Sequence, residues 1–212
     1  MLKVGLTGGI ASGKSTVAAM LRELGAHLVD TDQLARRAVA PGSAGLAWIV
    51  KAFGPGVLGP DHGLDRARLR ELVFNDPAQR QRLNQIVHPL VMDMVNEALA
   101  RLERSEPAGV AVVDVPLLFE VGWQARFDCT VLVYAPPAVQ QARLRVRDGV
   151  DAPAARAALA AQMPIADKRA QADFLVDNSG SLDETRKQVE GLWARLKGLT
   201  SSVTSRNKSE PS

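Results

Sequence analysis

The chain of 212 residues is long enough for one globular domain with a substantial core and room for inserted subdomains. Apolar residues make up 46% and charged residues 23%, as in an ordinary soluble protein, and an aromatic share of 4% predicts a mainly aliphatic core. A formal net charge of +3 is too small to indicate a nucleic-acid-binding protein. The longest apolar runs have the length of strands, so we expect no membrane span.

The single cysteine, Cys129, cannot form an intramolecular disulfide, which favours a cytoplasmic location. It begins the apolar run CTVLVYA, so we expect a small core residue rather than a nucleophile. The N-terminus runs directly into a predicted strand, without the apolar region of a signal peptide.

Predicted strands and helices alternate along the first part of the chain. Apolar and β-branched residues predict a buried strand over 2–7, and apolar residues at helical spacing predict a helix over 14–24. Gly25 is a typical residue for the C-terminal cap of that helix. A second strand over 27–30 and a helix over 31–39 follow.

The middle of the chain differs in character. Glycine and proline crowd residues 53–63, which indicates a loop. Helical patterns surround this loop over 44–52, 65–74 and 77–104. We therefore expect a helix-rich insertion at this point of the alternating pattern.

The last part of the chain returns to alternation. Strands are predicted within 109–120, 129–135 and 173–178, and helices over 136–148 and 152–162. Ser181 with Glu184 three residues later is a capping-box pattern, which predicts a final helix to about Leu196. The polar, serine-rich stretch 200–212 is expected to be disordered.

Strands separated by helices predict an α/β fold, with a doubly wound parallel sheet and helices on both faces. Ligands of such sheets bind at the carboxyl ends of the strands. Acidic side chains stand at three of the five predicted ends, at Asp30 and Asp32, at Asp114 and at Asp177.

The stretch GGIASGKS contains Gly8, Gly13, Lys14 and Ser15 at the spacing of a phosphate-binding loop. Glycines let successive backbone N–H groups point at one anion, and the next helix adds the positive end of its dipole. Lys14 would then reach the β- and γ-phosphates of a nucleotide, and Ser15 would ligate Mg²⁺. The alternative is a glycine-rich turn with a solvated lysine.

Asp30 and Asp32 end the second predicted strand, where carboxylates two residues apart face the same side. One could accept a proton from a hydroxyl group while the other orients that group or holds Mg²⁺ through water. The alternative is that Asp30 or Thr31 only caps the next helix. Asp114 is similar to the acid that supports Mg²⁺ in many phosphate-loop proteins, and a structural hydrogen bond is its alternative role.

Basic side chains gather between residues 143 and 169, and arginine stabilises the charge that develops during phosphoryl transfer. Small-molecule kinases often carry such groups on a mobile lid. Arg147 stands out because it precedes DGVD, a candidate hinge, although a solvated helix face accounts for most of these residues. Spacing alone does not select among Arg143, Arg145, Arg147, Arg156, Lys168 and Arg169.

The strings GLTGGIASGKSTV, VDTDQLARRAV, NQIVHPLV, VVDVPLLFE, RLRVRD and KRAQADFLVDNSGS closely resemble, in this order, the dephospho-coenzyme A kinase family. The resemblance extends from residue 2 to about residue 196. It implies transfer of the γ-phosphoryl group of ATP to the ribose 3′-hydroxyl of dephospho-CoA, with Mg²⁺ and no nucleic-acid or membrane partner. A monomer is favoured over an oligomer. The implied parts are a nucleotide-binding core at 1–40, 105–136 and 172–198, an acceptor-binding insertion at 41–104, a lid at 137–171 and a tail at 199–212.

The resemblance also implies roles for single residues. Asp32 matches the general base of the family, and Arg147 matches a lid arginine near the phosphates. The expected ATP contacts are Gly9, Ile10, Ala11, Ser12, Gly13, Lys14, Ser15 and Thr16, with Ser15 as the metal ligand and Asn178 near the adenine. The expected acceptor contacts are Asp32, His88, Pro89, Asp114 and Leu117. By itself, a lone histidine beside a proline, as at His88, is more typical of packing than of catalysis.

Two other classes share the phosphate loop. A kinase for a nucleoside or a sugar would have the same loop residues and a different acceptor. A GTP-dependent switch would need an N-K-x-D segment, and the only Asn-Lys pair, in NKSE near the C-terminus, lacks the acid at that spacing.

Overall fold

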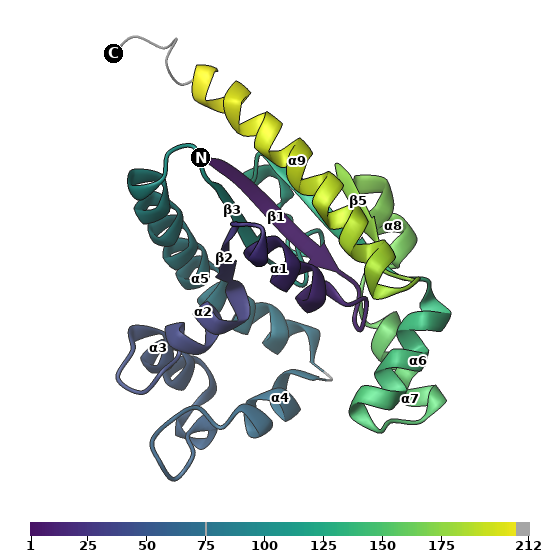
Figure 1. Ribbon diagram of the computed structural model, residues 1–212. Helices are drawn as coiled ribbons and strands as arrows, with labels where there is room; N and C mark the ends of the chain where they lie inside the picture. The colour runs from purple at the N-terminus through teal and green to yellow at the C-terminus, as the bar shows by residue number, and fades with distance from the viewer. Residues whose placement is uncertain (75, 207–212) are drawn as a thin grey trace. The chain divides into compact units, whose positions relative to one another are not determined.

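The computed structural model describes residues 1–74 and 76–206 (Figure 1), with side chains described as far as Thr200. The chain divides into two compact units, one formed by Met1–Val29 with the chain from Leu99 onward, and the other by Asp30–Ala98. The second unit therefore begins earlier and ends earlier than the expected insertion at 41–104. Among the described helices, none combines the length and the apolar character needed to cross a bilayer.

The first unit is built on a sheet with the strand order β2-β3-β1-β4-β5. The strands are β1 (Leu2–Gly8), β2 (His27–Asp30), β3 (Val110–Asp114), β4 (Cys129–Tyr134) and β5 (Phe174–Asp177). β1 pairs in parallel with β3 and with β4, so that Val4 stands opposite both Val112 and Cys129. The predicted parallel α/β sheet is confirmed, and the first strand of the chain lies at its centre.

The alternation of side chains along the strands buries both faces of the sheet. Leu2, Val4 and Leu6 of β1 belong to one buried cluster. This cluster includes residues of α1 (Lys14–Glu23) and α9 (Leu182–Arg206), which lie together along β1 in Figure 1. Residues of opposite parity, Ala111 and Leu132, are also fully buried, as expected for a sheet covered on both sides.

The chain between β4 and β5 folds into three helices, where the sequence predicted two. These are α6 (Pro137–Asp148), α7 (Ala152–Ala160) and α8 (Ile165–Gln171). Gly149, with φ of 67°, ends α6, and the Asp151 carboxylate caps α7 by accepting from the Ala154 N–H at 2.8 Å. Helix α8 was not predicted because it is short. It buries only Ile165 and Lys168, and two buried residues do not make a recognisable apolar periodicity.

The last helix, α9, is longer than predicted. Its start is as expected, since Ser181 and Glu184 exchange the hydrogen bonds of a capping box. The helix continues to Arg206, so the predicted disorder is wrong for residues 200–206. Leu192, Leu196 and Thr200 are buried at four-residue spacing, which extends the packed stripe of the helix past the predicted end. Residues 207–212, the rest of the predicted tail, lie outside the described residues.

The second unit is helical, as expected. It contains α2 (Thr31–Ala38), α3 (Ala44–Phe53), the short η1 (Pro55–Val57), α4 (Arg66–Phe74) and most of α5 (Pro77–Ser105). The predicted loop at 53–63 includes η1, and an isolated bridge joins Leu58 to Leu64 at its end. Each of these helices contributes buried aliphatic residues, namely Leu34, Leu46, Ile49, Val57, Leu69, Val91 and Val95.

Candidate functional site

The loop between β1 and α1 has the backbone shape of an anion cradle. Ala11, with φ of 56°, and Gly13, with φ of 88°, both adopt the left-handed conformation. At Ala11 this conformation costs about 1–2 kcal/mol, because the Cβ crowds the following carbonyl oxygen. Gly13 is the N-cap residue of α1 and supplies no side chain to accept from the first N–H groups of the helix. Those N–H groups and the helix dipole favour an anion at this point.

Lys14 and Asp114 meet beside this loop. The Lys14 ammonium donates a hydrogen bond to the Asp114 carboxylate, and the two form an ion pair. Their side chains are 18% and 16% exposed. The hydrogen-bonding role considered for Asp114 is therefore present in this structure, while a role beside Mg²⁺ stays a prediction.

The donor set at the start of α1 fits Mg²⁺. Ser15 is exposed in the first turn of α1, and Asp114 contributes a carboxylate at the end of β3. Hydroxyl and carboxylate oxygens are ligands that Mg²⁺ accepts, and in nucleotide sites the ion takes most of its remaining ligands from phosphate and water. Ser15 and Asp114 are thus the two side chains of this unit that we expect near the ion.

Asn178 lies against the phosphate loop, and both the nitrogen and the oxygen of its side-chain amide form hydrogen bonds. The Nδ2 group donates to the Ser12 carbonyl oxygen at 2.7 Å, and Oδ1 accepts from the Thr185 hydroxyl at 2.8 Å. The residue is 7% exposed, and a Cβ added at Gly13 would collide with its amide. The expected contact of Asn178 with adenine stays a prediction, and this geometry shows a contact with the loop itself.

Of the basic residues on α6, Arg143 is the one that reaches the loop. Its guanidinium donates to the Asn178 carbonyl oxygen at 2.8 Å and approaches the Ser12 carbonyl oxygen at 3.5 Å. Arg147 is 59% exposed and forms two hydrogen bonds with the Asp148 carboxylate, of 2.7 and 3.0 Å. This pairing lowers the pKa of Asp148 below its usual value. The predicted role of Arg147 at the phosphates is not tested by this contact.

Sequence spacing could have identified Arg143, since it precedes Arg147 by one helical turn and lies on the same face of α6. The solvated positions expected in this segment are observed at Arg145, Arg156 and Arg169. Lys168 is the exception, because its side chain is fully buried and its Nζ lies 2.6 Å from the Glu120 carboxylate.

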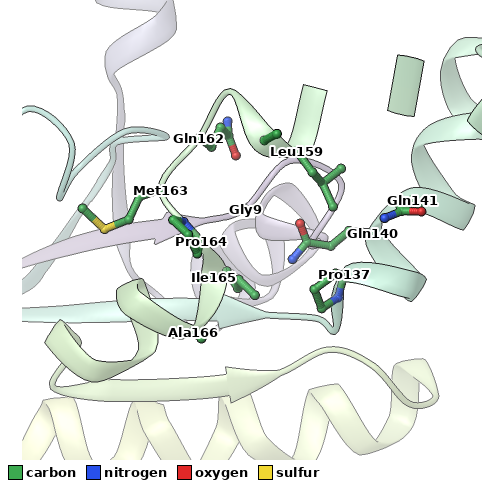
Figure 2. Close-up of a pocket in the computed structure, with 11 residues that line it drawn as sticks. Gly9, Pro137, Gln140, Gln141, Leu159, Gln162, Met163, Pro164, Ile165 and Ala166 are labelled. Carbon is green, nitrogen blue, oxygen red and sulfur yellow. The ribbon is translucent and has the colours of Figure 1, made fainter. Parts of the chain in front are cut away.

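Two glutamines that the sequence did not single out also lie at the loop. Gln140 is 2% exposed, and its Nε2 group donates to the Ala135 carbonyl oxygen at 2.7 Å. The Gln162 side-chain oxygen accepts from the Ile10 N–H at 2.9 Å. Both line a cavity of about 460 Å³ (Figure 2), together with Gly9, Pro137, Gln141, Leu159, Ala160, Met163, Pro164, Ile165 and Ala166. Contacts of this kind join positions far apart in the chain, so sequence spacing does not reveal them.

Asp30 and Asp32 belong to the second unit, where the structure separates their roles. The Asp30 carboxylate caps α2, since it accepts from the Gln33 N–H and from the Gln33 side chain, both at 3.0 Å. Asp32 is exposed in the first turn of α2. Within the described residues of its unit, no hydrogen bond or ion pair holds its carboxylate. The capping alternative thus applies to Asp30, and Asp32 stays the candidate base.

The expected acceptor contacts fall in different places. Pro89, inside α5, lines a cavity of about 350 Å³ in the second unit together with Trp48, Lys51, Ala52, Arg82, Gln85 and Ile86. His88 is half-buried, and burial lowers its pKa below the ordinary 6.5. Leu117 belongs to the first unit and is 40% exposed after β3. The cavity combines an indole with two cationic side chains, a lining suited to an anionic ligand with an apolar part.

Cys129 is the small core residue that the sequence predicted. It is 7% exposed in β4, and burial together with Asp173 and Asp128 raises its pKa to about 12. The thiolate, which is the nucleophilic form, is therefore scarce at neutral pH.

Comparisons with known proteins agree with this geometry. The family model for dephospho-CoA kinase matches residues 2–184. A dephospho-CoA kinase of Anaeromyxobacter dehalogenans is 48% identical over 198 residues, which cover 93% of this chain and 93% of that protein.

Solved structures are similar over most of the chain. A protein called TT1252, from Thermus thermophilus, superposes with a TM-score of 0.78 at 37% identity, over 92% of this chain and 97% of that one. A dephospho-CoA kinase from Campylobacter jejuni gives 0.70 at 26% identity, over the same shares of the two chains. The phosphate loop, the parallel sheet and these matches lead to one conclusion: the chain belongs to the dephospho-CoA kinase family.

Proposed function

We propose that this enzyme transfers the γ-phosphoryl group of ATP to the ribose 3′-hydroxyl of dephospho-CoA, with Asp32 as general base. The observation that carries the proposal is the phosphate loop that leads into the uncapped start of α1, with Lys14 paired to Asp114 beside it, in a chain of this family. An anion cradle of this kind serves the donor side of a phosphoryl transfer.

On the donor side, the backbone N–H groups at the start of α1 bind the phosphates of ATP. Lys14 moves from Asp114 to the β- and γ-phosphates, because the triphosphate carries more negative charge than one carboxylate. Ser15 and Asp114 would hold Mg²⁺, and the bound ion would supply neutralisation of the charge on the phosphate oxygens. Arg147 exchanges its contact with Asp148 for the transferring group when the lid closes.

On the acceptor side, Asp32 accepts the proton of the 3′-hydroxyl as the new P–O bond forms and the bond to ADP breaks. The Asp30 carboxylate caps α2 by accepting from the Gln33 N–H, and this cap fixes the backbone that carries Asp32. The cavity at Trp48, Lys51 and Arg82 is suited to the rest of the acceptor, whose pyrophosphate is anionic and whose pantetheine arm is largely apolar. Pro89 lines this cavity together with Arg82, Gln85 and Ile86 of the same helix, α5, and His88 precedes it on that helix.

A direct assay tests this function. The purified chain is incubated with Mg-ATP and dephospho-CoA, and CoA is measured by mass spectrometry together with ADP. Formation of CoA and ADP in equal amounts supports the proposal. A kinase for a nucleoside or a sugar shares the loop, so a panel of such acceptors is run in parallel. The proposal would be contradicted if a nucleoside or a sugar were phosphorylated while dephospho-CoA was not.

The cellular setting is also part of the proposal. We infer a cytoplasmic enzyme, which membership of a biosynthetic family supports, and we infer that it acts as a monomer. Sedimentation of the purified chain with and without Mg-ATP measures the oligomeric state, and a stable dimer would contradict the second part.

A further inference from the structure

The phosphate loop is held on both sides of its strained residue. Ala11 adopts a left-handed φ of 56°, which a residue with a Cβ rarely does. The residue before it, Ile10, donates its N–H to the Gln162 side-chain oxygen at 2.9 Å. The residue after it, Ser12, accepts at its carbonyl oxygen from the Asn178 amide at 2.7 Å. Two amide side chains from distant parts of the chain thus hold the Gly9–Ile10 and Ser12–Gly13 peptide groups, which lie on either side of the segment 10–12 with Ala11 at its centre.

Gln162 is itself held in place by the segment that follows β3. It stands between α7 and α8, and the N–H of the next residue, Met163, donates to the Glu120 carboxylate at 3.1 Å. The same carboxylate oxygen of Glu120 lies 2.6 Å from the buried Nζ of Lys168 in α8. Glu120 therefore fixes the segment 163–168 to the body of the unit and sets where the Gln162 side chain begins.

Asn178 is fixed in a comparable way on the other side of the loop. Its oxygen accepts from the Thr185 hydroxyl at 2.8 Å, and its own carbonyl oxygen accepts from Arg143 at 2.8 Å. The contact at Ile10 is half-buried and the contact at Ser12 is buried, so water competes weakly for either.

We propose that Gln162 is a positioning residue that, opposite Asn178, holds Ala11 in its left-handed conformation and so keeps the loop ready for the phosphates of ATP. Gln162 holds the Gly9–Ile10 peptide, whose carbonyl oxygen accepts from the Ser12 N–H at 3.0 Å and so closes the turn around Ala11. Without the Gln162 contact this peptide is free to turn, the hydrogen bond to Ser12 loosens, and Ala11 relaxes to a negative φ. The N–H groups of the loop then no longer converge on one anion. Bound nucleotide must then restore the strained conformation of Ala11. The free-energy cost of that change is subtracted from the binding free energy, so the affinity for nucleotide falls.

The inference rests on the proposed binding of ATP at this loop, and it adds a lid residue as part of what shapes the donor site. Gln162 lies between α7 and α8, within the predicted lid at 137–171. A conformational change of that lid would therefore alter the hydrogen bond between Gln162 and Ile10.

The test compares Gln162→Met with Gln141→Met in the full chain. Gln141 lines the same cavity, and among the described residues it makes no hydrogen bond to the loop, so it is a matched control. Isothermal titration with Mg²⁺ and the β,γ-imido analogue of ATP measures the dissociation constant directly. We expect a rise of about threefold to tenfold for Gln162→Met, the range for one lost hydrogen bond, and less than twofold for Gln141→Met. The kcat at saturating ATP should change less than the KM for ATP.

A second variant separates positioning from a general loss of structure. Glycine adopts positive and negative φ about equally, so Ala11→Gly removes the strain against which Gln162 holds the loop. In the Ala11→Gly background, Gln162→Met should change the dissociation constant by less than about twofold. Gln162→Ala serves in place of Gln162→Met if that variant unfolds, as checked by circular dichroism.

Two outcomes overturn the inference. One is an equal change in affinity for Gln162→Met and Gln141→Met. The other is an undiminished effect of Gln162→Met in the Ala11→Gly background, since the side chain would then act on nucleotide independently of Ala11. The proposed function fails by a different observation: unaltered protein that binds the analogue and makes no CoA from dephospho-CoA. In that case the affinity comparison still decides the role of Gln162.

Discussion

At the scale of single residues, the structure divides the pair of carboxylates at the end of β2. A strand-end D-x-D pattern predicts two acids on one side, yet it does not say which one the helix cap uses. The hydrogen bonds show that Asp30 serves as the cap, which leaves Asp32 exposed and available. Which of the two acids caps the helix is decided by the position of the first helical turn, and sequence reasoning locates that position only to within a residue or two.

Replacement of Asp32 by Asn tests its role as general base. The amide keeps the shape of the side chain and loses the ability to accept a proton, so we expect kcat to fall about 10²- to 10⁴-fold. Affinity for Mg²⁺ and the β,γ-imido analogue of ATP should stay unchanged, as measured by titration calorimetry. Asp30→Asn is the matched control, because Asn also caps helices well, and it should cost less than tenfold. Near-normal turnover of Asp32→Asn would exclude the base role.

His88 gives a pH dependence of stability with a defined sign. Burial lowers its pKa below 6.5, so the unfolded chain takes up a proton at a higher pH than the native protein does. The contribution of the neutral imidazole to the free energy of unfolding is present above pH 6.5 and is lost as the pH falls below it.

Urea titrations at pH 7.5 and at pH 5.5 measure this loss. We expect the unaltered protein to lose more stability over this interval than His88→Asn does. His62→Asn is a suitable control, since His62 is exposed and its left-handed φ of 57° is one that Asn tolerates. Equal pH dependence for the unaltered protein and His88→Asn would contradict the burial argument.

At the scale of elements, the strands and long helices followed from the sequence, and the short polar helix did not. β1, α1 and β4 carry apolar runs whose period matches their structure, and each was predicted within one or two residues. In α8 the only fully buried polar side chain is Lys168, whose partner Glu120 lies in another segment of the chain. A helix stabilised by one long-range ion pair has no signature in local periodicity.

The pair formed by Lys168 and Glu120 should therefore be important for stability. Lys168 is fully buried, and no well-aligned hydrogen-bond acceptor for its ammonium is present in the described part of the chain, so the contact is chiefly an ion pair. Removal of one partner leaves the other charge without compensation. We expect Glu120→Leu to lower the free energy of unfolding by about 3–5 kcal/mol.

A double-mutant cycle in urea checks this expectation. Glu120→Leu combined with Lys168→Met should cost clearly less than the sum of the two single variants, because no buried charge then remains. Arg186→Met serves as the control for an exposed pair, since Arg186 and Glu23 are 46% and 59% exposed, and it should cost no more than about 1 kcal/mol. Strict additivity of the buried pair would refute the coupling.

At the scale of the whole molecule, the sequence predicted an insertion at 41–104 within an α/β core, and the structure divides the chain into a sheet-containing unit and a helical unit, Asp30–Ala98. The boundaries differ because α2 joins the helical unit, while α5 ends in the sheet-containing one after Ala98. Sequence reasoning placed the boundary at the glycine and proline that follow α2. Contacts decide it differently, since α2 contacts α3, and both lie within the helical unit.

Nucleotide should raise the thermal stability of the chain as a whole. A ligand at 100 times its dissociation constant stabilises the native state by about 2.7 kcal/mol. For a chain of this length, that corresponds to a rise in Tm of roughly 5–10 °C. Differential scanning calorimetry with Mg²⁺ and the β,γ-imido analogue measures the shift. Lys14→Ala should abolish most of it at the same ligand concentration, whereas Lys51→Ala, in the other unit, should retain it. An equal shift in both variants would place the nucleotide elsewhere.

The position of β1 at the centre of the sheet has a consequence for how the protein is made. β1 leaves the ribosome well before its two neighbours, β3 and β4, which begin at Val110 and Cys129. At a synthesis rate of 5–20 residues per second, the apolar strand LKVGLTG waits for roughly 5–20 s before a partner exists. Throughout that interval it is an unpaired hydrophobic edge, the kind of segment that chaperones bind. The helical segment 30–98, by contrast, is complete in the nascent chain before the sheet can close around its first strand.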